Sequence, residues 1–307
     1  MTIFKNQLKT ILLLGALSAL VIGVGALIAP GYIYLFGLLA LAINLGAYFF
    51  SDRIVLRMHG ASEVSPADAP ELHAMVDELA ARANLPKPRL FVIPDAQPNA
   101  FATGRNPRHG VVAVTEGIVR LLDRRELRGV IAHELAHIKN RDILISSLAA
   151  AAAALITYVA QALSLSALFG GANRDDDGGE GSTGGGLVVA LVAPLVATLV
   201  QMSISRSREY LADATGAAIA EDPDALASAL LKLERAAEVV PSETTTPATA
   251  SLFIVNPFGA LQTVARWFST HPPTAERVER LRQLSQRQRP SANTRRHRAR
   301  IVALEER

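Results

Sequence analysis

No cysteine occurs among the 307 residues of this chain. The absence excludes a disulfide framework, and it leaves His, Asp and Glu as the side chains that a metal site could use. A cysteine-free chain also fits a reducing compartment.

A large excess of positive charge is absent as well. Formal net charge is only +3, although the isoelectric point is about 9.4. The arginine-rich tail at residues 277–307 has no aromatic residue among its arginines. We therefore predict that the chain binds no nucleic acid and that this tail lies near anionic lipid.

Long uncharged hydrophobic stretches are the main compositional feature. Half of the residues are hydrophobic and mean hydropathy is +0.25, whereas charged residues still make up 19%. Residues 10–29 and 33–50 contain no charged side chain, and Pro30-Gly31 separates them, so we predict a membrane-spanning helical hairpin. Lys5 and Lys9 precede the first stretch as in a secretory signal, but its length and the second stretch argue against cleavage.

Two weaker apolar stretches, at residues 143–169 and 187–204, predict a second membrane pair, with a buried or interfacial helical pair as the alternative. A hydrophilic loop rich in Gly and Asp, residues 170–186, lies between them. Lys and Arg flank the four stretches on one side, so the positive-inside rule places both termini and residues 51–142 in the cytoplasm. The lack of charge inside the first two stretches argues against a transporter.

The His-Glu-Leu-Ala-His segment at residues 133–137 carries the strongest chemical signal. Positions i and i+4 of a helix share one face, so His133 and His137 can bind the same metal ion, and Glu134 is placed as a general base. Asp123 and Glu126 predict a capping box at the start of this helix. The alternative is a pair of surface histidines on an amphipathic helix.

A catalytic zinc keeps three protein ligands, so a third side chain is needed. Glu209 is the candidate, and Asp213 lies four residues further on the same helical face, where it could accept a hydrogen bond from a ligand histidine. The alternative is the solvated start of a mixed-charge helix. If the helix with the two histidines ran unbroken into residues 143–169, the ligands would lie within roughly two helical turns of the bilayer.

The polar regions predict a small sheet among helices. Residues 89–93, 99–103 and 111–114 are expected to be strands, and residues 68–83 a helix with Asp68 and Glu71 as its capping box. Further helices are expected from Asp222-Pro223 and over residues 274–284. The segment Asn99, Ala100, Phe101 is a candidate edge for an extended substrate, with an ordinary hairpin as an equal alternative.

The run AHELAHIKNRD at residues 132–142 resembles the active-site helix of the HtpX family of bacterial heat-shock proteases. Residues 99–104, 205–213 and 270–273 and the N-terminal hairpin match that family as well. The resemblance implies a membrane α-helical protein with an α+β zincin-like (gluzincin) peptidase domain, related to the CAAX-prenyl endopeptidases. It also implies a mostly helical fold with a small β-sheet.

The same resemblance implies one Zn²⁺ per chain, held by His133, His137 and Glu209, with Glu134 as the catalytic base. It further implies that His271 lies near the substrate carbonyl. Arg277 is implied to pair with Asp213 behind the zinc.

The implied function is an endopeptidase of the bacterial inner membrane that cleaves damaged or misfolded membrane proteins during stress. Its partners would be those substrates and the lipid bilayer. Two alternatives are a processing peptidase of one membrane-anchored substrate and a non-catalytic scaffold with a structural zinc, against which Glu134 counts. We expect five segments: 1–50, 51–142, 143–204, 205–288 and the basic tail 289–307.

Overall fold

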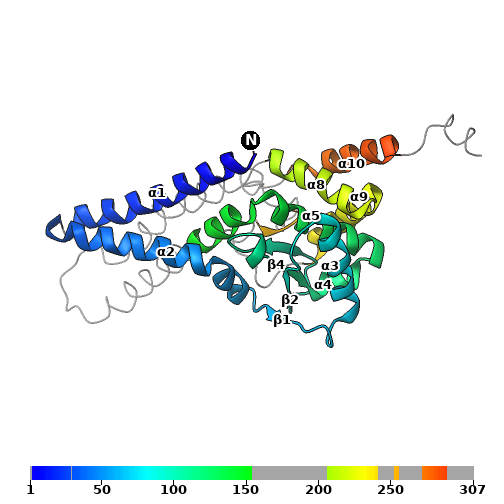
Figure 1. Ribbon diagram of the computed structural model, residues 1–307, viewed down its shortest axis with the longest axis horizontal. Helices are drawn as coiled ribbons and strands as arrows, with labels where there is room; N and C mark the ends of the chain where they lie inside the picture. Colours follow the sequence, from blue (N-terminus) through cyan, green and yellow to red (C-terminus); the bar gives the residue numbers. More distant parts are fainter. Residues whose placement is uncertain (1, 29, 154–205, 241–251, 256–271, 289–307) are drawn as a thin grey trace, which may run out of the picture.

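The computed structural model describes residues 2–28, 30–153, 206–240, 252–255 and 272–288. A long helical hairpin projects from a body of helices around a small sheet (Figure 1). The two hairpin helices run side by side, and the turn between them lies at the end away from the body. The fold is mostly helical with a small mixed sheet, as the sequence predicts.

The hairpin consists of α1 (Thr2–Ile28), a short 3-10 turn η1 (Pro30–Tyr32) and α2 (Ile33–Met58). Asn44 on α2 links the two helices by donating to Ser18 Oγ at 2.6 Å and to the Leu14 carbonyl at 3.2 Å. Within the described residues, one helical stretch, Pro30–Met58, is long and apolar enough to cross a bilayer. Thr10–Gly23 of α1 is a shorter apolar stretch.

The sheet has four strands in the order β1-β2-β4-β3. They are β1 (Ser62–Glu63), β2 (Arg89–Ile93), β3 (Ala100–Thr103) and β4 (Val111–Thr115). β2 and β4 are parallel, while β3 pairs antiparallel with β4 and forms an edge of this described sheet. The predicted strands are confirmed to within one residue. Their nearly continuous apolar runs suit strands that are buried on both faces.

Helix α3 (Pro70–Ala83) shows one wrong prediction. Its N-cap is Ala69, and neither Asp68 nor Glu71 forms the predicted capping box. Asp68 instead accepts hydrogen bonds from the backbone N–H and hydroxyl of Ser65. This local turn competes with capping, and Pro70 suits the first helical position, so the helix starts two residues later than predicted.

Helix α5 (Arg124–Asn140) begins as predicted, with the Asp123–Glu126 capping box complete. It ends at Asn140, and the following residue, Arg141, caps it in a left-handed conformation with φ 56°. A new helix, Ile143–Ala153, follows. The helix therefore does not run unbroken toward the membrane, because the chain turns at Arg141 and Asp142.

The remaining described helices are α4 (Glu116–Leu121), α8 (Arg206–Ala220), α9 (Pro223–Val239) and α10 (Thr274–Gln288). Asp222 caps α9 and Pro223 is its first residue, as predicted. α5 packs against α8 and α9. Residues 154–205, which include most of the second predicted membrane pair and the acidic loop, lie outside the described residues, as do 241–251 and the basic tail.

The sheet has a different core on each face. Ala100 and Ala102 of β3 belong to the main core with α3, α5, α8 and α9. Phe101 belongs to a second core on the opposite face, with Val55 and Leu56 from the end of α2. β3 therefore lies between α5, which carries the two histidines, and the end of α2, the second helix of the hairpin.

Candidate active site and metal centre

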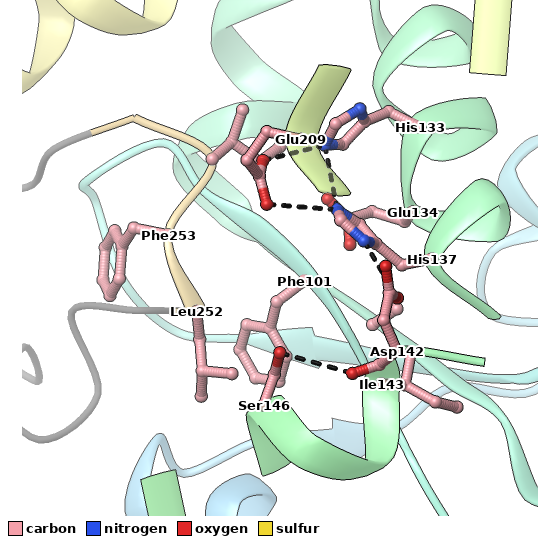
Figure 2. Close-up of a pocket in the computed structure, with 12 residues that line it drawn as sticks. Phe101, His133, Glu134, His137, Asp142, Ile143, Ser146, Glu209, Leu252 and Phe253 are labelled. Carbon is pink, nitrogen blue, oxygen red and sulfur yellow. Dashed lines mark hydrogen bonds and ion pairs between the residues drawn. The ribbon is translucent and has the colours of Figure 1, made fainter. Parts of the chain in front are cut away.

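Three predicted ligand side chains converge between α5 and α8. Potential ligand atoms of His133, His137 and Glu209 all lie within 4.8 Å of one another. The two Nε2 atoms are 3.2 Å apart, and the Glu209 carboxylate oxygens lie 3.8 Å from His133 Nε2 and 3.9 Å from His137 Nε2. Figure 2 shows the carboxylate facing both imidazoles.

A carboxylate contacts the Nδ1 atom of each imidazole. His133 Nδ1 lies 3.1 Å from Asp213 Oδ1, and His137 Nδ1 lies 3.1 Å from Asp142 Oδ1. When each Nδ1–H faces its carboxylate, each Nε2 presents a lone pair to the other and to Glu209. These lone pairs repel one another unless a cation lies between them.

The arrangement fits a zinc-sized divalent cation. Two imidazole nitrogens on one tetrahedral zinc, at Zn–N distances of about 2.0–2.1 Å, lie about 3.3 Å apart. The observed separation of 3.2 Å is close to this value. Burial lowers the pKa of His137, but Asp142, Glu209 and Glu134 outweigh that effect and raise it to about 10. The surroundings thus strongly favour a positive charge.

The Glu134 carboxyl lies in the same pocket and is buried. Burial is the main cause that raises its pKa to about 8, and the nearby Glu209 carboxylate adds to the shift. His137 and a hydrogen bond from the Ala102 backbone N–H act in the opposite direction. A carboxyl with a pKa near neutrality can both take up and release a proton.

Arg277 joins α10 to this site. Its Nε and one terminal nitrogen donate to the two Asp213 oxygens at 2.9 and 2.7 Å, and its other terminal nitrogen donates to the Ile254 carbonyl at 2.8 Å. The side chain is buried. Burial disfavours the charged form of Asp213, yet Arg277 and His133 hold the pKa of that carboxyl down at about 2.

The pocket has a polar half and an apolar half. Polar side chains surround the three potential ligands, while rings and aliphatic side chains line the other side (Figure 2). Its lining residues are Phe101, Ala102, His133, Glu134, His137, Asp142, Ile143, Ser146, Glu209, Leu252, Phe253 and Ile254.

The predicted substrate edge is only partly at the pocket. Phe101 lines it, whereas Asn99 and Ala100 do not. Asn99 Oδ1 accepts a hydrogen bond from the Ile254 N–H. The Asn99 side chain therefore holds in place the segment at residues 252–255, which supplies part of the pocket lining. His271 lies outside the described residues.

Asp142 is the residue whose role the sequence analysis missed. It occurs in the quoted run at residues 132–142, but no function was assigned to it. A carboxylate five residues after His137, just past the end of the helix, was the available signal. Only the turn at Arg141 brings it back to His137 Nδ1.

A family model and curated relatives both match most of this chain. The profile of "Peptidase family M48" matches residues 66–285. "Protease HtpX homolog" of Syntrophobacter fumaroxidans is 50% identical over 282 residues, covering 91% of this chain and 99% of that protein. That of Thermococcus kodakarensis is 51% identical, covering 91% and 96%. The crystal structure of Ste24p from S. mikatae aligns with TM-score 0.48 and 18% identity, over 91% of this chain and 66% of that one.

Proposed function

Because this chain is a metalloprotease of peptidase family M48, we propose that it is a membrane-bound zinc endopeptidase with His133, His137 and Glu209 as ligands of one Zn²⁺. Its proposed role is to cleave damaged or misfolded membrane proteins on the cytoplasmic side of the bacterial inner membrane. The observation that carries the proposal is the convergence of two imidazole lone pairs and a carboxylate beside the buried Glu134.

Zinc in such a site supplies Lewis acidity toward the scissile carbonyl and toward water. Glu134 takes the proton of the attacking water and returns it to the leaving amine, a dual role for which its buried position beside the proposed ligands is suited. Asp142 and Asp213 orient the two imidazoles through their Nδ1 atoms. Arg277 balances the charge of Asp213, and His271 is proposed to lie near the substrate carbonyl.

The substrate is proposed to bind as an extended strand along the edge formed by Asn99, Ala100 and Phe101. Two observations support this placement. The edge of β3 that faces away from β4 runs beside α5, and the Ala102 N–H on that edge reaches Glu134. A peptide paired with this edge would lie next to the proposed catalytic base.

The membrane orientation remains that predicted from Lys and Arg, with both termini and the peptidase body in the cytoplasm. The apolar stretch Pro30–Met58 ends next to the body, so the site lies close to a membrane-spanning helix. Substrates already in the membrane would meet the site through their loops and juxtamembrane segments.

The decisive experiment compares wild type with Glu134→Gln. The full chain is purified in detergent and loaded with zinc, and casein cleavage and bound zinc are measured. We expect the variant to keep about one zinc per chain and to lose peptidase activity, because Glu134 is a base and not a ligand.

Glu126→Gln is the matched control. It removes another buried carboxylate from α5, but Gln still satisfies a capping box, so activity should persist. Cleavage by Glu134→Gln at the wild-type rate would refute the mechanism. Loss of zinc from that variant would show that Glu134 is a ligand.

A further inference from the structure

The apolar half of the pocket has no part in the proposed chemistry. Phe101 reaches it from β3, and Leu252 and Phe253 reach it from the segment at residues 252–255. All three side chains are buried, with at most 6% of their surface exposed. In Figure 2 they lie across the pocket from His133 and Glu134.

The alternation of side chains along β3 explains why this half is apolar. Ala100 and Ala102 face the main core under α5, whereas Phe101 points to the opposite face of the sheet. A substrate strand added to the edge of β3 alternates in the same way. Successive substrate side chains near the scissile bond therefore point to opposite faces, and one of them meets Phe101, Leu252 and Phe253.

The end of α2 supports this apolar wall from behind. His59 directly follows α2, and its ring centroid lies 5.4 Å from that of Phe101 and 6.3 Å from that of Phe253. Val55 and Leu56 of α2 share a hydrophobic cluster with Phe101 and Leu252. Burial lowers the pKa of His59, although Asp95 opposes the shift, and a neutral ring is compatible with apolar neighbours.

We propose that Phe101, Leu252 and Phe253 form a subsite for a bulky apolar side chain of the substrate next to the scissile bond, and that His59 positions its wall. This inference rests on the proposed peptidase function. The lining of this subsite is apolar and buried, so an acidic substrate side chain, which would lose its hydration in the subsite, is disfavoured.

The test uses the full zinc-loaded chain in detergent and fluorogenic peptides that differ at one position on either side of the cleaved bond. Leu or Phe at one of these positions should raise kcat/KM by roughly 10–100-fold over Ala, and Asp should abolish cleavage. Leu252→Trp fills the subsite and should shift the preference toward Ala. Phe253→Ala enlarges it and should improve cleavage of a Trp peptide relative to a Leu peptide.

Phe91→Ala is the matched control. Phe91 belongs to the same cluster and sheet face as Phe101 but does not line the pocket, so its loss should leave the side-chain preference unchanged. His59→Ala should weaken the preference at unchanged zinc content. His59→Phe, which restores a ring between Phe101 and Phe253, should recover it.

Two results would overturn the subsite while leaving the peptidase function intact. One is a wild type that cleaves without apolar preference at any position. The other is a set of Leu252 and Phe253 variants whose preference shifts no more than that of Phe91→Ala. If the zinc-loaded wild type cleaves neither casein nor any of the peptides, the proposed function is refuted and the subsite with it.

Discussion

At the scale of single residues, the geometry of the site depends on carboxylates that are not ligands. Asp142 and Asp213 each hold one imidazole through Nδ1, so both Nε2 atoms point to the same place. Asp213 is buried, and the bidentate contact with Arg277 stabilises its negative charge. Arg277 acts on His133 through Asp213, and one of its terminal nitrogens also lies 3.4 Å from His133 Nε2.

Replacing Arg277 tests this indirect role. Arg277→Met leaves the Asp213 charge buried without its partner, so we expect a loss of about 3–5 kcal/mol in unfolding free energy. Zinc affinity should fall roughly 10–100-fold, because His133 loses its fixed orientation. The stability and zinc affinity of Arg277→Lys should lie between those of wild type and Arg277→Met. The lysine ammonium keeps the positive charge but lacks the planar guanidinium that binds both Asp213 oxygens.

The measurements are thermal unfolding and competition with a zinc chelator of known affinity. Arg280→Met is the control, because Arg280 lies on the same helix but is exposed and pairs with Glu276. Wild-type zinc affinity in Arg277→Met would contradict the assigned role.

At the scale of elements, glycines set how closely two helices approach α5. A Cβ on Gly216 of α8 would lie 2.8 Å from the backbone N and Cα of His133. A Cβ on Gly129 of α5 would lie 2.8 Å from the backbone N of Leu226 on α9. The first contact fixes the distance between the helices that carry His133 and Glu209, while the second joins α5 to α9, which carries no proposed ligand.

Alanine substitutions at these two glycines distinguish an effect on fold stability from an effect on the geometry of the zinc site. We expect Gly216→Ala and Gly129→Ala each to destabilise the fold by about 1–3 kcal/mol, because each methyl group forces two helices apart. Only Gly216→Ala should also weaken zinc binding, by about tenfold or more, since it moves Glu209 away from the histidines. Chelator competition and thermal unfolding of both variants provide the comparison, and equal zinc affinities would refute the expectation.

At the scale of the whole molecule, the hairpin and the peptidase body are structurally connected. Leu13 and Leu17 of α1 pack against Ile145 and Leu148 of the helix that follows Asp142. The hydroxyl of Ser147 on that helix lies 2.7 Å from the hydroxyl of Thr103, at the end of β3. The hairpin is thus linked, through the helix Ile143–Ala153, to the strand that the substrate is proposed to join.

The absence of native cysteine makes the predicted orientation directly testable. Arg108→Cys lies at an exposed position of the body, and Gly178→Cys lies in the acidic loop, outside the described residues. In intact cells an impermeant thiol reagent should label position 178 and not position 108, while both should react after permeabilisation. Labelling at 108 and none at 178 would reverse the orientation.

The position of the site beside the hairpin also predicts where substrates are cut. His133 and Glu209 belong to the body, not to the apolar stretch Pro30–Met58. Cuts mapped by mass spectrometry on a multi-span substrate should therefore fall in loops and juxtamembrane segments. A concentration of cuts at the centres of hydrophobic spans would instead indicate an intramembrane protease.

Local sequence patterns were sufficient for most of the individual elements. The capping box at Asp123 and Glu126 marks the start of α5, and strand β2 has the predicted bounds. His133 and His137 share a helical face because their spacing is a property of the helix itself. The capping box predicted at Asp68 failed for an equally local reason, since Ser65 offered the same carboxylate a competing turn.

The assembled site required contacts between distant parts of the chain. Glu209 reaches the histidines only because Gly216 lets α8 approach α5, and Arg277 reaches Asp213 from a helix 64 residues further along. Without the family resemblance, no spacing rule would have linked Arg277 to this site. The sequence by itself determined which residues could bind a metal and on which helices they lie, because those properties depend on neighbours within one turn. Tertiary packing alone decided that they meet and which apolar side chains face them, because burial and helix approach depend on the whole core.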